Sequence, residues 1–122
     1  ICALIFIVLS VVVAVYGYFS VEKRNDALLV SVTSAARSAE GSKVSEYFGI
    51  ARALTREWKD AEKLYHIFLD HSLCEDIELN IKQIELYADF RYTSEMLNAC
   101  YKCIAALEHV KDSQQLSIEN IL

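Results

Sequence analysis

The chain has 122 residues, a net charge of −5, no proline and only three glycines. The acidic balance argues against binding of DNA or RNA, which needs a basic footprint. Folds built from strands and tight turns need glycine and proline at their corners, so the scarcity of both indicates an all-α fold. All of the net negative charge lies in residues 71–122, which is typical of a solvated surface that keeps a domain soluble.

The first predicted element is a membrane-spanning helix. Residues 1–19 contain only two positions that are neither apolar nor aromatic, Ser10 and Gly17, and the first charge comes at Glu22. A helix of this length rises about 28 Å, close to the roughly 30 Å of hydrocarbon in a bilayer. The run is longer than the apolar core of a signal peptide, and no small-residue cleavage site follows it. We therefore predict a transmembrane anchor at residues 1–21.

Charge beside the anchor predicts its orientation. Lys23 and Arg24 follow the span directly, and basic residues so near a membrane exit favour the cytoplasmic side. The four cysteines fit a reducing compartment, in which thiols stay free. We predict a single-pass membrane protein whose C-terminal domain is cytoplasmic. Because the chain begins at Ile1 rather than at Met, we also expect a further N-terminal segment, whose charges would bear on the topology.

A juxtamembrane stalk helix is predicted at residues 22–41. Apolar residues recur there, from the end of the anchor onward, at heptad-like spacings of seven, four, three and four. We call them the seam: Val21, Leu28, Val32, Ala35 and Ala39. Two interpretations are open, because the stalk helix can pack through the seam on its own domain or can associate with the stalk of another copy.

Amphipathic helices are predicted in a bundle domain at residues 42–122. Ser42 is expected to cap the first of them, at about 43–70, and Ser72 with Glu75 forms a capping-box pattern for the next. No glycine or proline separates that helix from the following one, so a single continuous rod is an alternative to two helices. The predicted fold is all-α, with one N-terminal transmembrane helix followed by a small amphipathic bundle of three to four helices.

The helix at about 43–70 has a wide apolar face that is rich in aromatic rings. Tyr47, Phe48, Trp58 and Tyr65 fall on this face at 100° per residue. We expect Phe48 and Trp58 to be buried in the domain core. If part of the face is left uncovered, Tyr47 and Tyr65 are the residues expected to contact a partner.

A basic row lies roughly opposite the Trp58 face of the same helix. Arg52, Arg56, Lys59 and Lys63 are spaced four, three and four positions apart. Near a bilayer such a row could bind anionic headgroups, at about 1 kcal/mol for each basic residue at the surface. It could equally dock an acidic partner, or form a plain solvated face, which charge rows usually do.

Two pairs of residues have a spacing that suits metal ligands. His71 with Cys74, and Cys100 with Cys103, each lie three positions apart and so on one side of a helix. If the two helices pack antiparallel, the pairs could meet as a zinc site with three cysteines and one histidine. The alternative is that these cysteines are buried thiols that fill the core as small apolar side chains.

No catalytic motif occurs in the chain, and three glycines cannot build a phosphate-binding loop. We therefore predict no catalytic residues, no cofactor, no small-molecule substrate and no enzyme activity. The predicted function is a membrane-anchored protein–protein interaction module, an accessory or assembly subunit whose partners are the bilayer and other subunits of a membrane complex or a second copy. The alternatives are a metal- or redox-responsive sensor using the cysteines and a module that binds anionic lipid through the basic row.

Overall fold

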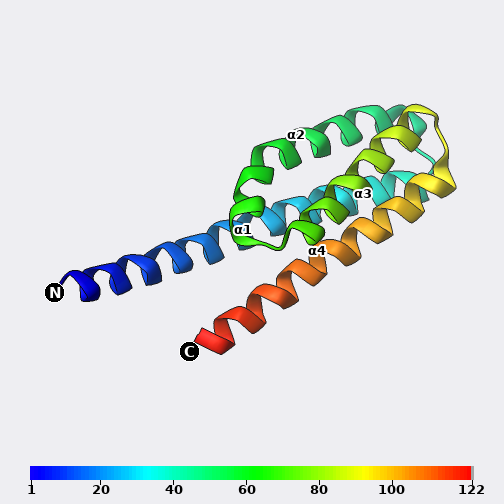
Figure 1. Ribbon diagram of the computed structural model, residues 1–122. Coiled ribbons are helices and arrows are strands. Elements are labelled where there is room, and N and C mark those ends of the chain that lie inside the picture. The colour runs from blue at the N-terminus through cyan, green and yellow to red at the C-terminus, as the bar shows by residue number, and fades with distance from the viewer. Residues whose placement is uncertain (122) are drawn as a thin grey trace.

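The structure, a computed structural model, consists of four helices joined by short turns (Figure 1). The helices are α1 (Cys2–Glu40), α2 (Val44–Phe68), α3 (His71–Asp89) and α4 (Thr93–Ile121). The backbone is described for residues 1–121, and the side chains for all of these except residues 117, 118, 120 and 121. Helices α1 and α3 each pack against both α2 and α4, so neighbours in the chain run antiparallel around one core. The all-α prediction is confirmed, and α3 and α4 are two helices rather than one rod.

The seam of α1 is buried within the chain itself. Its five residues are at most 1% exposed and belong to the same core as the inner faces of the other helices. The segment 22–41, predicted as a stalk, is therefore the first helix of the bundle. Of the two interpretations of the seam, packing on its own domain is the one that the structure shows, and self-association through the seam would require the bundle to open.

Residues 1–16, which comprise Ile1 and the first part of α1, extend beyond the bundle and are exposed along their whole length (Figure 1). Burial begins at Gly17, where the Phe68 ring lies so close that a Cβ at residue 17 would overlap it. By length and composition α1 could cross a membrane, a property that it shares with signal sequences. It runs on into the bundle as one unbroken helix.

Helices α1 and α3 end in the same way, with a non-glycine residue in the left-handed conformation. Ser42 has φ 52° and Arg91 has φ 59°. After α1, the amide of Ser42 donates to the Ala39 carbonyl and the amide of Lys43 donates to the Ser38 carbonyl. These two bonds form a Schellman motif, and an equivalent pair closes α3.

Both predicted N-caps are wrong. Ser42 closes α1, so its backbone is not free to cap α2, whose N-cap position is Lys43. Helix α3 begins two residues earlier than its capping-box pattern predicts, with Asp70 rather than Ser72 at the N-cap position. Ser72 therefore lies inside the helix, and its hydroxyl donates to the Asp70 carboxylate at 3.0 Å.

Replacing Ser42 or Arg91 by glycine should raise the free energy of unfolding by about 0.5–1 kcal/mol each, because glycine adopts positive φ without steric cost. Urea denaturation in mild detergent, followed by circular dichroism, measures the change. The matched control is Ser34→Gly in the exposed interior of α1, which should destabilise by about 0.5 kcal/mol. Equal destabilisation by all three substitutions would contradict the assignment of the two turns.

Candidate functional site

The aromatic face of α2 is mostly enclosed by the chain's own helices. Tyr47 and Tyr65 are fully buried and Trp58 is 3% exposed, with its ring packed edge-on against that of Tyr65 at 5.2 Å between centroids. Burial of Trp58 was predicted and is confirmed, whereas burial of Phe48 is wrong, since Phe48 is 54% exposed. The covering helices enclose only the stripe that begins at Tyr47, and Phe48 lies 100° round the helix from it. Tyr47 and Tyr65 thus present no free surface to a partner.

The basic row is exposed along α2. All four of its side chains, Arg52, Arg56, Lys59 and Lys63, face solvent. The Arg52 guanidinium lies 4.6 Å from the centroid of the Phe48 ring, a cation–π contact. Because α2 runs antiparallel to α1, the row follows the long axis of the bundle, and Lys63 is the member nearest to the projecting segment. A bilayer crossed by that segment would meet the end of the row and not its length.

The predicted zinc ligands do not come together. Cys74, Cys100 and Cys103 are fully buried, whereas the His71 side chain is 74% exposed and pairs with Glu75 at 2.8 Å. Among the residues that the structure describes, no group of three or more histidine, cysteine or acidic side chains could hold a metal ion. The zinc prediction is wrong because His71 opens α3 on its solvent side, while Cys74 lies on the buried stripe of that helix.

Burial also makes the three thiols unreactive. Removal from water raises the pKa of Cys100 and of Cys103 to about 12, and it raises the pKa of Cys74 as well. A thiolate is the form that reacts with oxidants and binds metals, so raised pKa values keep these cysteines inert at neutral pH. The cysteines therefore fill the core as small apolar side chains, which was the alternative to a zinc site.

The raised pKa values predict a loss of stability at alkaline pH. A thiol ordinarily ionises near its pKa of 9.0, whereas Cys100 and Cys103 ionise in the fold only near 12. As the pH rises from about 9 towards 12, the unfolded chain releases protons that the folded chain keeps, so the free energy of unfolding falls.

Urea denaturation at about pH 8 and about pH 10 measures this fall. The double variant Cys100→Ala, Cys103→Ala should be less stable throughout but should lose less stability between the two pH values. Burial raises the pKa of Tyr65 as well, but this residue is present in both proteins, so its contribution cancels in the comparison. An equal fall in both proteins would show that the thiols are not the cause.

Asn25 is a buried polar residue that joins three helices. It is 2% exposed, and it lies in the seam between Val21 and Leu28. Its side-chain amide nitrogen donates to the Leu107 carbonyl of α4 at 2.9 Å, and its oxygen accepts from the Tyr65 hydroxyl of α2 at 2.8 Å. Asn25 was not among the predicted residues, although its spacing of four from Val21 and three from Leu28 is the signal that would have located it.

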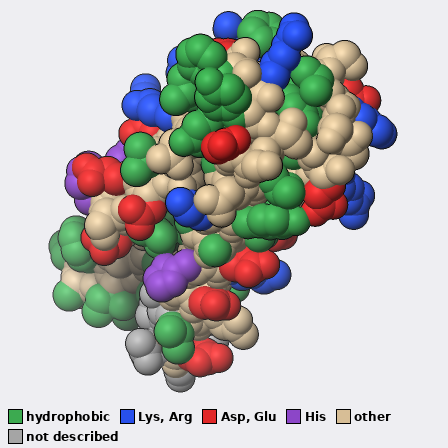
Figure 2. Space-filling model, turned by 90° about the vertical axis from the view of Figure 1, so that its right-hand side faces the viewer, with side chains coloured by type: hydrophobic (Ala, Val, Ile, Leu, Met, Phe, Trp, Pro, Cys, Tyr) green, Lys and Arg blue, Asp and Glu red, His purple; other side chains and the backbone are tan. Residues whose placement is uncertain are grey.

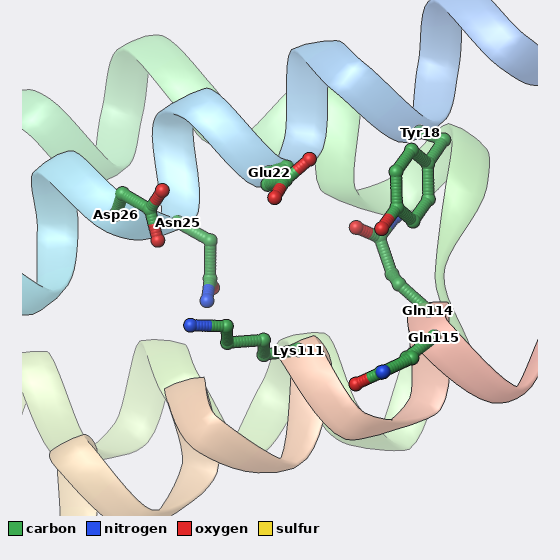
Figure 3. A pocket seen from close by; sticks show the side chains of 7 residues that line it. All are labelled: Tyr18, Glu22, Asn25, Asp26, Lys111, Gln114 and Gln115. Atoms are coloured by element: carbon green, nitrogen blue, oxygen red, sulfur yellow. The ribbon is translucent and has the colours of Figure 1, made fainter.

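A polar cavity opens beside Asn25, between α1 and α4 (Figure 3). It has a volume of about 220 Å³. The side chains that line it are Tyr18, Glu22, Asn25 and Asp26 of α1 and Lys111, Gln114 and Gln115 of α4. In Figure 3 Tyr18 and Asn25 point from α1 towards α4, Lys111 points back towards Asn25, and Glu22 and Asp26 lie beside α1 along the edge of the gap. Carboxylates, an ammonium group and amides thus converge on one small space, which none of the sequence patterns predicted.

The hydrogen bond between Asn25 and Tyr65 predicts a non-additive pair of substitutions. Asn25→Leu should lower the free energy of unfolding by about 1–3 kcal/mol, because the buried Tyr65 hydroxyl loses its acceptor. Tyr65→Phe should also be destabilising. The double variant should cost about 1 kcal/mol less than the sum, since no polar partner is then left unpaired.

Urea denaturation of the four proteins measures this coupling. The control combines Asn25→Leu with Tyr47→Phe. The second substitution removes a different hydroxyl, which is hydrogen-bonded to Thr93 at 3.0 Å, so the losses in free energy of unfolding from these two substitutions should be additive. If the losses in free energy of unfolding from Asn25→Leu and Tyr65→Phe were also additive, the hydrogen bond between Asn25 and Tyr65 would not have the proposed strength.

A family described as Domain of unknown function (DUF4363) matches residues 15–121. The chain belongs to this family. The DUF4363 match begins next to Gly17, where α1 becomes buried, and so it covers the bundle and leaves out most of the projecting segment. No curated protein and no solved structure matches the chain.

Proposed function

We propose that the chain is a membrane-anchored interaction module, an accessory or assembly subunit of a membrane complex. The anchor is the apolar start of the chain, predicted at residues 1–21, of which residues 1–16 project from the bundle. Large apolar side chains along this segment are between 42% and 100% exposed, and a bilayer is the environment that would cover all sides of such a helix. The basic residues after it, Lys23 and Arg24, support a cytoplasmic bundle.

The observation that carries the proposal lies at the other end of the bundle. Phe48, Phe90 and Tyr92 are each more than half exposed there, and the rings of Phe90 and Tyr92 stack at 5.7 Å between centroids. The hydrogen bond between Tyr47 and Thr93 places Phe48 and Tyr92 at the same level of the bundle. We call Phe48, Arg52, Phe90 and Tyr92 the distal patch.

The composition of the distal patch resembles that of a protein interface. Aromatic residues and arginine are enriched at binding hot spots, where they fill well-packed pockets from which water is excluded. Figure 2, which views the end with the α1–α2 and α3–α4 turns, shows hydrophobic side chains gathered among charged ones. The 24 residues of α1 from Gly17 to Glu40 rise about 35 Å, so the patch would stand at that height above the membrane.

The partner is a protein subunit or a second copy of this chain, and the experiment separates binding from anchoring. Phe90→Ser with Tyr92→Ser should reduce the size of the complex extracted from membranes in mild detergent, because two exposed rings lose their contacts. Blue native electrophoresis measures that size. The control is Leu79→Ser, a residue of α3 that is 57% exposed and lies outside the distal patch.

Alkaline carbonate washing of the same membranes should leave every variant in the pellet. Release of the wild type by carbonate would contradict the proposed anchor but not the proposed interaction. A wild type that migrates as a monomer, or patch variants whose complex keeps its full size, would contradict the interaction.

A further inference from the structure

The polar cavity lies where the bundle meets the projecting segment. Tyr18, Glu22 and Asp26 recur every four residues along α1, starting two residues after the exposed segment ends. Lys111 and Gln115 have the same spacing on α4, on the opposite wall. If residues 1–16 span a bilayer, this cavity is at the level of the lipid headgroups, where the anchor leaves the hydrocarbon.

The charged groups in the cavity are not neutralised by one another. Among the described residues, the ion pairs within 4.0 Å are His71–Glu75 and Lys82–Glu78, neither of which involves the cavity. Glu22 and Asp26 therefore present two carboxylates, and Lys111 presents one ammonium group, to the same space (Figure 3). Such an arrangement suits a ligand that carries both a positive and a negative group.

Gln114 adds an amide group to the lining of the same cavity. It is 9% exposed, it lines the cavity, and it has no hydrogen bond within 3.5 Å to any described residue. The Gln114 amide thus has donors and an acceptor available to a bound molecule.

We propose that the cavity binds a phosphoethanolamine group. The primary ammonium lies between Glu22 and Asp26, the phosphate faces Lys111, and the Gln114 amide completes the hydrogen bonding. Lysine commonly binds phosphate as a point charge, and three N–H donors of an ammonium can be shared between two carboxylates. The volume of about 220 Å³ suits a group of this size. The group belongs either to a free solute or to the headgroup of a membrane phospholipid, and only the lipid source rests on the proposed anchor.

The first experiment tests the cavity with the free group. O-Phosphoethanolamine is titrated into the full chain in micelles of a detergent without amines, and binding is followed by calorimetry and by the side-chain amide signals of Gln114 in NMR spectra. Saturable binding is expected. Glu22→Gln with Asp26→Asn, and separately Lys111→Gln, should each weaken it about tenfold or more, the factor that corresponds to about 1.4 kcal/mol.

Matched controls remove the same charges elsewhere. Asp76→Asn and Lys82→Gln on α3 are exposed and lie outside this cavity, so they should bind as the wild type does. Phosphocholine, which has no N–H donors, should bind more weakly than phosphoethanolamine. Absence of saturable binding, or equal binding by the cavity variants and the wild type, would overturn the proposal.

The second experiment identifies the source. The full chain is released for native mass spectrometry from nanodiscs that contain equal amounts of phosphatidylethanolamine and phosphatidylcholine with the same acyl chains. Selective retention of phosphatidylethanolamine by the wild type, and its loss in Lys111→Gln, supports the lipid headgroup. Binding of the free group without selective lipid retention supports a free solute. If carbonate washing releases the chain from membranes, the proposed anchor is wrong, and the titration with O-phosphoethanolamine still tests the cavity.

Discussion

The hydrogen bonds of Asn25 tie α1 to both α2 and α4 inside the core. With Asn25 included, the seam repeats at spacings of four and three, so its apolar pattern is nearly unchanged when α1 slides by seven residues, or about 10 Å. Hydrophobic burial alone therefore discriminates weakly between the two positions. Asn25 removes the ambiguity, because only one register brings it to both the Tyr65 hydroxyl and the Leu107 carbonyl. In any other register a polar side chain would be buried without partners, at a cost of several kcal/mol.

That register places the groups of the cavity opposite one another. Glu22 and Asp26 are the neighbours of Asn25 at three positions before and one after, and Lys111 lies one turn beyond Leu107. The bond that aligns the helices thus also aligns the two carboxylates with the ammonium group. At the other end, the contact between Tyr47 and Thr93 holds α2 against the start of α4. Polar contacts between helices position both surfaces to which we assign binding.

Local pattern was sufficient for the helices and for most of the core. The seam, Trp58 and the buried cysteines all follow from apolar periodicity, because one buried stripe per helix is a property of each helix alone. The exposure of Phe48 could not be predicted in this way, because the width of a buried stripe depends on how many helices cover it. Ser42 has good chemistry for an N-cap, but the closing of α1 takes its backbone first. The cavity needs α1 and α4 to be paired across about 80 residues, which spacing within one helix does not reveal.

The continuous α1 connects the two ends mechanically. No glycine or proline interrupts it between Gly17 and Glu40, and the Phe68 ring covers Gly17 itself, so the helix has no hinge at the junction with the projecting segment. Helix α4 has no such support, since its last turns leave the side of α1 in Figure 1. A ligand held between Glu22, Asp26 and Lys111 would add a bridge between these helices where they begin to separate. Binding to the folded state alone stabilises it by RT ln(1 + [L]/Kd), about 2.7 kcal/mol at a hundredfold excess over Kd. Occupancy of the cavity would thereby stiffen the attachment of α4, the helix that begins next to Tyr92, without any change in the distal patch itself.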